Sequence, residues 1–201
     1  MNQETSSLVL GALILIVLLP VVYAVARSVT ALGDMWSAHL LAPLAPVIGG
    51  TVNRNSPCIK GNYQRRDVRV SFSPKQSVGS GDSATWINAF YIEVTDLPGR
   101  HDWQIRFRVT GMFGQGPKSL FIEAQDEALA ERLDHSGAIA EVEAVSAPTT
   151  DYVTVAYESR RKTLTYTDDV SPRWIASHDQ FTKQLALTAR LSQINERVNS
   201  A

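Results

Sequence analysis

The longest apolar segment of the chain lies near its start. Residues 8–26 (LVLGALILIVLLPVVYAVA) contain no charged and no strongly polar side chain. Nineteen helical residues rise about 28 Å, close to the hydrocarbon thickness of a bilayer. The pattern predicts an N-terminal transmembrane helix over residues 1–27. Ser7, Gly11 and Ala12 are small residues at a spacing that lets another helix pack closely against this span.

A cleaved signal peptide is the alternative to a retained anchor. Residues 24–26 read Ala-Val-Ala before Arg27, which resembles a cleavage site. The leader, however, has no Lys or Arg and carries Glu4, and the apolar run exceeds the usual signal core of about 7–15 residues. We expect a retained anchor.

Positive charge gives the orientation. No Lys or Arg precedes the span, whereas Arg27 follows it directly. The positive-inside rule then predicts a single-pass protein of the bacterial inner (cytoplasmic) membrane, with a periplasmic N-terminus and a cytoplasmic main domain. The whole chain has a net charge of −1, which argues against nucleic-acid binding. Cys58 is the single cysteine, so we expect a buried free thiol and no internal disulfide.

Residues 28–54 have mixed signals and are predicted to connect the span to the soluble domain. Apolar residues at near-helical spacing suggest a helix that turns along the membrane surface, and the prolines at 43 and 46 should stop it. An irregular linker is the alternative. The residues expected at the membrane interface are Arg27, Trp36, Arg65, Arg66 and Arg69. The last three arginines would equally suit a solvated strand edge.

Alternating apolar and polar positions predict a β-rich α+β domain over residues 55–170, with about seven mostly antiparallel strands. The strands are expected at 68–72, 84–95, 103–109, 119–124, 138–145, 152–158 and 163–167. The Leu97-Pro98-Gly99-Arg100 segment is expected to turn the second of these strands into the third as a hairpin.

Two helices are predicted beside these strands. Asp126 can cap a short helix that Gly137 ends, and Ser177 with Gln180 has capping-box spacing before a helix within residues 171–201. The second helix is amphipathic, and its apolar face is expected either to pack on the protein's own sheet or to receive a partner helix. That face consists of Leu187, Leu191, Ile194 and Val198.

No motif for catalysis or cofactor binding stands out. The four histidines lie far apart in the sequence and have no metal-ligand spacing. Residues 111–119 resemble a phosphate-binding loop, but Pro117 displaces the lysine and a strand is expected to follow. Residues 79–83 lack the spacing of a nucleophile elbow. We therefore predict no catalytic residue, no metal and no cofactor.

The function predicted from these features is that of a non-enzymatic accessory or scaffold subunit of a larger bacterial membrane complex, of an energy-transducing kind such as a photosynthetic or respiratory one. Its partners would be other membrane-protein subunits and the lipid bilayer, with no nucleic acid and no small-molecule substrate. The alternative is a membrane-tethered binding or sensor module that recognises a peptide, a lipid or a small ligand.

Overall fold

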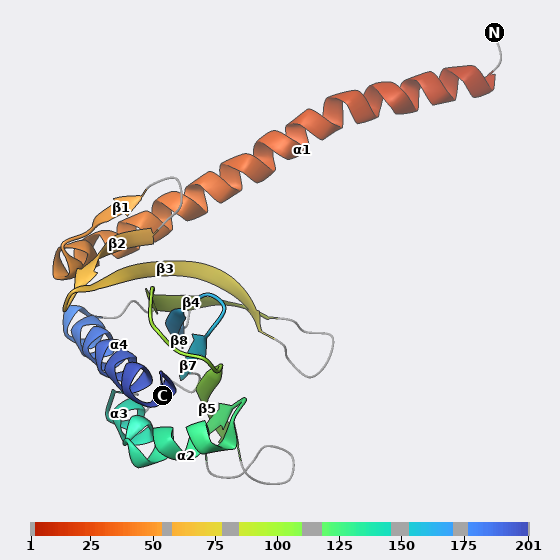
Figure 1. The fold of residues 1–201 in the computed structure, drawn as a ribbon. Helices are drawn as coiled ribbons and strands as arrows, with labels where there is room; N and C mark the ends of the chain where they lie inside the picture. The colour runs from red at the N-terminus through yellow and green to blue at the C-terminus, as the bar shows by residue number, and fades with distance from the viewer. Residues whose placement is uncertain are drawn as a thin grey trace.

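A computed structural model describes residues 3–53, 58–77, 85–109, 118–145, 153–170 and 177–200. Figure 1 shows a long helix that projects from a domain of strands and shorter helices. The elements in chain order are α1 (Gln3–Leu41), the 3-10 helix η1 (Ala42–Ile48), β1 (Thr51–Asn53), β2 (Cys58–Tyr63), β3 (Arg66–Ser77), β4 (Thr85–Val94), β5 (Trp103–Val109), β6 (Lys118–Ala124), α2 (Glu127–His135), α3 (Ala138–Val145), β7 (Val153–Glu158), β8 (Thr163–Val170) and α4 (His178–Asn199).

The helix α1 is longer than the apolar run that predicts it. It continues for 39 residues, with Pro20 inside it, and ends at Leu41. Among the residues that the structure describes, one helix is long and apolar enough to cross a membrane, and it lies in this N-terminal segment. The α-helix ends two residues before Pro43, as expected, because the proline ring disfavours helical backbone at the residue before it. The chain then continues as η1 rather than as an irregular linker.

In the part of the chain that the structure describes, the sheet has eight strands in the order β1-β2-β3-β4-β8-β7-β5-β6. Every neighbouring pair is antiparallel. The predicted antiparallel, β-rich fold is therefore confirmed, although β1 and β2, the two strands at one end of the sheet, were not predicted.

The predicted hairpin between β4 and β5 is wrong. The strands β8 and β7 lie between them in the sheet. The segment after β4 crosses these two strands at the β7–β8 turn, where the Leu97 N–H donates to the Lys162 carbonyl (3.0 Å) and the Tyr157 hydroxyl donates to the Leu97 carbonyl (2.9 Å). Alternation identified both strands correctly, but it contains no information about which strands become neighbours.

The strand predicted over residues 138–145 is the helix α3. Its sequence, AIAEVEAV, alternates like a strand, yet it also places Ala138 and Val142 one helical turn apart, and both are buried. On its other side Glu141 accepts from the Arg190 guanidinium of α4 at 2.8 Å. Alanine and glutamate favour helix, so helix packing prevailed over the period-two pattern.

The two predicted helix starts are confirmed. Asp126 accepts from the Ala128 N–H (3.1 Å), and the Ser177 hydroxyl accepts from the Gln180 N–H (3.2 Å). The Gln180 side chain, in contrast, donates to the Val145 carbonyl (3.3 Å), so it ties α4 to the end of α3. Both helices thus begin where a side-chain oxygen satisfies an early backbone N–H.

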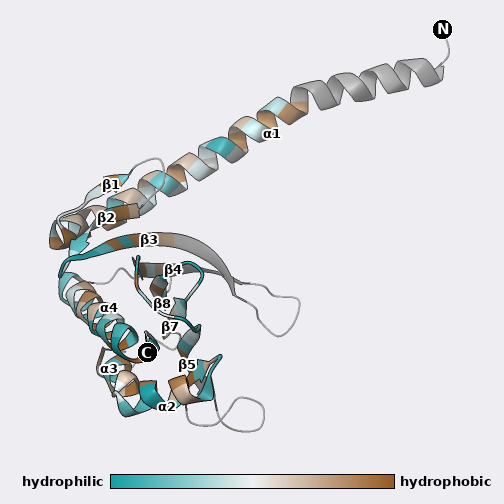
Figure 2. Cartoon of the chain, in the orientation of Figure 1, coloured by the Kyte–Doolittle hydropathy of each residue, from teal (hydrophilic) through white to brown (hydrophobic). Residues whose placement is uncertain are grey.

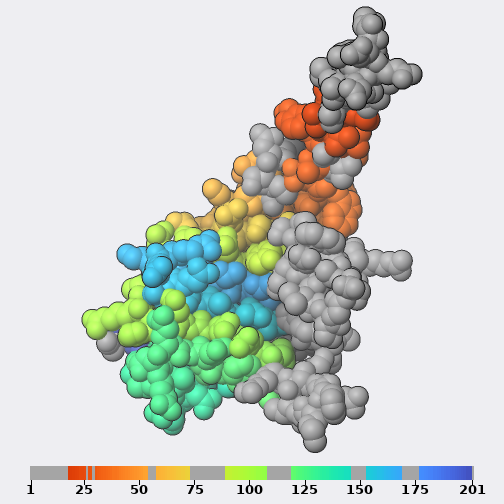
Figure 3. Space-filling model, turned by 90° about the vertical axis from the view of Figure 1, so that its right-hand side faces the viewer, coloured from red at the N-terminus to blue at the C-terminus, as the bar shows by residue number. Residues whose placement is uncertain are grey.

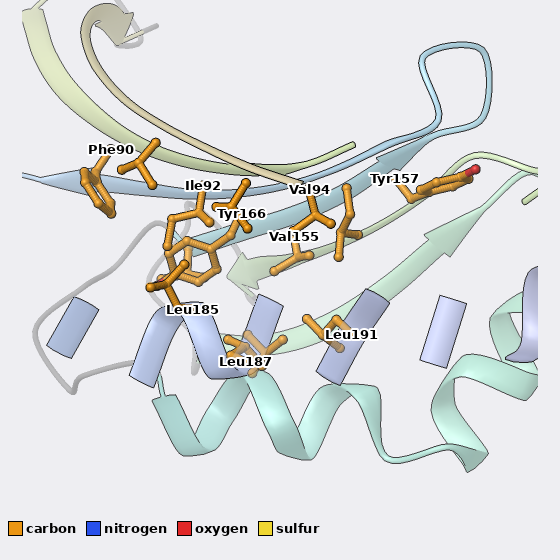
Figure 4. Close-up of a cluster of buried hydrophobic side chains, with 14 of the residues drawn as sticks. Phe90, Ile92, Val94, Val155, Tyr157, Tyr166, Leu185, Leu187 and Leu191 are labelled. Atoms are coloured by element: carbon orange, nitrogen blue, oxygen red, sulfur yellow. The ribbon is translucent and has the colours of Figure 1, made fainter. Parts of the chain in front are cut away.

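The core lies between the sheet and α4. Figure 4 shows Ile92 of β4, Val155 of β7 and Tyr166 of β8 directed from the strands toward α4. The other side of α4 contacts α2 and α3. Because the sheet covers one side of α4 and two helices cover the other, α4 is a central element of the domain.

The core also extends to the end of α1. Leu41, together with Leu44 and Ile48 of η1, is fully buried in the same cluster as Ile59 and Val70 of the sheet. The residues assigned to a membrane-surface connector therefore include part of the hydrophobic core. Cys58 on β2 is a buried free thiol, as the sequence predicts.

Candidate interaction surface

The helix α1 exposes apolar side chains beyond Arg27, the first charged residue after the apolar run. Leu32, Met35 and Trp36 are 66%, 68% and 46% exposed. Figure 2 shows the hydrophobic positions that continue along α1 toward the domain. Large apolar side chains grouped on a surface mark interaction sites more often than isolated ones do.

A groove runs beside this part of α1. It has a volume of about 500 Å³ and is lined by Met35, Ala38, His39, Ala42 and Val52. These residues come from α1, η1 and β1, so three elements meet here. We call it the juxtamembrane groove. Four of its five residues are apolar, which suits an apolar side chain of another protein better than a charged ligand.

The aromatic ring of Trp36 joins α1 to the sheet. Its centroid lies 5.8 Å from that of Phe72 on β3, with the two planes tilted by 59°. Such a tilted pair stabilises the contact beyond the area that it buries. The end of α1 is therefore held against the domain, and the exposed side chains near it have a defined position.

A second groove, of about 430 Å³, lies over β5, β6 and β7. Its polar lining includes Asp102, Gln104, Glu123 and Glu158. The Asp102 carboxylate accepts from the Ser159 hydroxyl (2.6 Å) and the Ser159 N–H (2.7 Å), and these two bonds lower its pKa. Lined by carboxylates and amides, this groove suits a ligand that donates hydrogen bonds. Among the described residues no three His, Cys, Asp or Glu side chains are placed to hold a metal ion.

The arginines predicted at the membrane interface lie in different surroundings. Arg66 makes a bidentate ion pair with Glu196 of α4 (2.5 and 2.8 Å), which raises the pKa of Arg66 and lowers that of Glu196. Arg69 lies 3.6 Å from Glu93, while Arg65 is exposed in the β2–β3 turn. Arg27 is exposed on α1. The charge of Arg66 is thus already neutralised within the protein.

The predicted partner-helix face of α4 is covered by the protein itself. Leu187, Leu191 and Ile194 are buried, and Val198 is half-buried against the same core. This placement agrees with the first alternative, packing within the protein's own domain, and leaves no open face there for a partner helix.

The remaining candidates lie either outside the description or on separate elements. Ser7, Gly11 and Ala12 lie within α1, in the part whose side chains are outside the description. Residues 79–83 and 111–117 also lie outside the described residues. The four histidines are on separate elements: His39 on α1, His101 before β5, His135 at the end of α2 and His178 at the start of α4.

One set of residues was missed by sequence reasoning, a row of buried polar side chains along α4. Asn195 accepts from the Trp103 indole N–H (2.7 Å) and donates to the Pro98 carbonyl (2.8 Å), and Gln184 donates to the Asp168 carboxylate (2.9 Å). The sequence does contain a pattern that indicates this row, because polar residues recur every three or four positions along α4. The buried row is Gln184, Thr188, Ser192, Asn195 and Asn199.

Fold and surface together define an antiparallel α+β domain whose core includes the end of one long apolar helix. Comparison with protein-family models, curated proteins and solved structures finds no match for this chain. Its function must therefore be argued from its own residues.

Proposed function

We propose that this protein is a non-enzymatic, membrane-anchored accessory or scaffold subunit. In this role α1 crosses the membrane and the α+β domain is held beside the subunits of a larger complex. The observation that carries the proposal is the exposed apolar surface of α1 around Met35, which lies next to the juxtamembrane groove and outside the apolar run.

The way in which α1 joins the domain supports a scaffold rather than a flexible tether. The helix is continuous from the apolar run to Leu41, which is buried in the core. The fourteen residue steps from Arg27 to Leu41 correspond to about 20 Å of helix. A domain joined in this way stays at a set distance from the bilayer, as a subunit that positions others requires. Figure 3 shows the described part of α1 standing out from the domain.

The proposal also includes the orientation of the chain in the membrane, the kind of complex and the partners. Arg27, the first charge after the apolar run, favours a cytoplasmic domain and a periplasmic N-terminus in a bacterial inner membrane. An energy-transducing complex, photosynthetic or respiratory, is the kind of assembly in which we place it. The partners are other membrane subunits that meet Met35 and the juxtamembrane groove.

A binding or sensor module is the second candidate. The groove over β5, β6 and β7 favours it, because Asp102, whose pKa is lowered by the hydrogen bonds from Ser159, lines a volume of about 430 Å³ together with Glu123 and Glu158. A basic peptide or a polyamine has the matching chemistry. This candidate predicts that binding of such a ligand weakens on substitution of Glu123 by Gln.

The test is native mass spectrometry of the tagged full-length chain, extracted in mild detergent from the membranes of its own cells. We expect other subunits to co-purify at fixed stoichiometry. Met35→Lys places a charge beside the juxtamembrane groove and should release them, whereas Thr30→Lys, an exposed change elsewhere on α1, should not. A chain that is extracted without any other subunit contradicts the proposal.

A further inference from the structure

We infer that two copies of this chain pair through α1 as a parallel coiled coil. The contact is made by Val22, Val25, Val29, Leu32 and Trp36, which we call the α1 seam. This inference rests on the proposed role of α1 as the membrane anchor, and it names a second copy of the chain as one partner within the assembly.

The spacing of the α1 seam is that of a heptad repeat. Its members follow one another at intervals of three, four, three and four residues. Apolar residues at this alternating spacing form the a and d positions through which two helices interlock. Val22, Val29 and Trp36 share one of these positions, and Val25 and Leu32 share the other. A β-branched residue at the first position with leucine at the second, as in Val29 and Leu32, favours two parallel strands.

The described side chains of the α1 seam are largely exposed, although the Trp36 ring also contacts Phe72. Val22, Val25, Leu32 and Trp36 are 61%, 58%, 66% and 46% exposed. The buried side of the helix is marked instead by Ser37, Ala38 and Leu41. A second helix can therefore reach Val22, Val25 and Leu32 directly, and at Trp36 it meets the exposed part of a ring whose other side contacts Phe72.

Charge is absent from the α1 seam and lies on the opposite side of the helix. Arg27, Asp34 and Leu41 are seven residues apart, so they lie along one line, and Leu41 faces the domain. The positions that flank the seam include Ala26, Ser28 and Gly33, which are small. Small flanking residues allow two helices to approach closely.

The bilayer makes a second copy the natural occupant. Two copies of a chain that crosses once are inserted in the same direction, so their helices are parallel and their heptads are in register. Five side chains on each helix, at about 100 Å² each, bury roughly 1,000 Å² in total, the lower bound for a specific interface.

The position of Leu32 and Trp36 outside the lipid provides a hydrophobic driving force for pairing of the two helices. They follow Arg27 by five and nine residues, which is about 8 and 14 Å along the helix axis. The headgroup layer on one side of a bilayer is about 5–8 Å thick. When α1 stands perpendicular to the bilayer, Leu32 and Trp36 thus lie at or beyond the outer edge of the headgroup layer. Their exposure to water there is unfavourable, and helix pairing reduces that exposure.

The test is disulfide cross-linking in native membranes. Cys58 is first replaced by Ser, and a single cysteine is then introduced by Leu32→Cys in the α1 seam or by Thr30→Cys two residues away on another side of α1. Both positions are exposed, so neither variant disturbs the core. On mild oxidation we expect Leu32→Cys to give a species of twice the 22.1 kDa chain mass, with about tenfold less from Thr30→Cys.

The same membranes are washed with alkaline carbonate, which separates failure of the pairing from failure of the anchor. If the chain stays in the pellet and Leu32→Cys gives no dimer, the pairing is wrong and the anchor stands. An adduct of another mass means that a different subunit occupies the α1 seam, which also overturns the inference. If carbonate releases a chain that still forms the Leu32 dimer, the pairing stands and the proposed anchoring role fails.

Discussion

Gly61 determines how closely η1 approaches the sheet. A Cβ atom at this position of β2 would collide with the backbone carbonyl and the side chain of Ile48. Ile48 is itself buried, so neither partner can move aside without opening the core. The absence of a side chain at residue 61 is therefore a packing requirement.

We predict that Gly61→Ala lowers the free energy of unfolding by about 1–3 kcal/mol, the usual cost of overpacking a core. Urea unfolding of the detergent-solubilised protein measures it. Gly33→Ala is the matched control, since a Cβ there has no neighbour within 4 Å among the described residues and alanine favours the helix. Equal unfolding free energies for the two variants would contradict this account of Gly61.

The Arg66–Glu196 pair makes stability depend on pH. The Arg66 hydrogen bonds lower the pKa of Glu196 below its ordinary value of 4.5. A carboxyl whose folded pKa is lowered stabilises the protein above its unfolded pKa, and this contribution is lost as pH falls through the folded pKa.

We therefore expect Glu196→Gln to reduce the melting temperature at pH 7 and to make little difference in strongly acidic solution, below the folded pKa of Glu196. Thermal melts of both proteins between pH 7 and pH 3 provide the comparison. A gap between the two that stays constant over this range would show that the ion pair is not its cause.

At the scale of elements, α4 holds the domain together through polar as well as apolar contacts. Asn195 is fully buried and bonds to Trp103 of β5, to the Pro98 carbonyl and to Asn199 within α4. These bonds fasten the segment that crosses from β4 to β5. Removing such a side chain leaves buried donors and acceptors without partners.

Asn195→Ala is expected to cost about 2–4 kcal/mol of unfolding free energy, because two or more buried groups lose their hydrogen bonds at about 1–3 kcal/mol each. Gln193→Ala, at an exposed position of the same helix, should change it by less than about 0.5 kcal/mol. Equilibrium denaturation of the two variants measures both changes in unfolding free energy. A change for Asn195→Ala as small as that for Gln193→Ala would refute the argument.

The alternation of apolar residues was enough to predict most strands, because each has one face in the core. Ile92 and Val94, for example, point inward on β4 and are buried. It could not predict that β8 and β7 enter between β4 and β5, since that order depends on contacts between residues far apart in the sequence. It also failed for residues 138–145, where period two and period four coincide.

The candidate interaction surface was only partly predictable for the same reason. Apolar Met35 and Trp36 near a span are visible in the sequence, and they suggested a membrane-proximal role. The juxtamembrane groove also needs Ala42 of η1 and Val52 of β1, which are brought beside α1 by strand pairing that no local pattern indicates. Nor does Arg66 reveal its partner, which is 130 residues away.

At the scale of the whole molecule, the helix that could cross the membrane and the folded domain form one unit. Leu41, Leu44 and Ile48 belong to the same core as the sheet and α4. A boundary at residue 55, where the soluble domain was expected to begin, would cut through this core. A boundary at residue 35 would remove the projecting part of α1 and leave the core complete.

We predict opposite outcomes for chains that start at these two positions. The chain that starts at residue 35 should fold and unfold cooperatively without detergent. The chain that starts at residue 55 loses three fully buried aliphatic side chains, each worth about 2–5 kcal/mol, which together approach or exceed the usual stability of a domain, about 5–15 kcal/mol. It should therefore be unfolded or aggregated. Circular dichroism melts of both chains measure whether each one unfolds cooperatively. A cooperative melt from the shorter chain would show that η1 and the end of α1 are dispensable for folding. The domain would then be tethered to α1 and would not include it in its core.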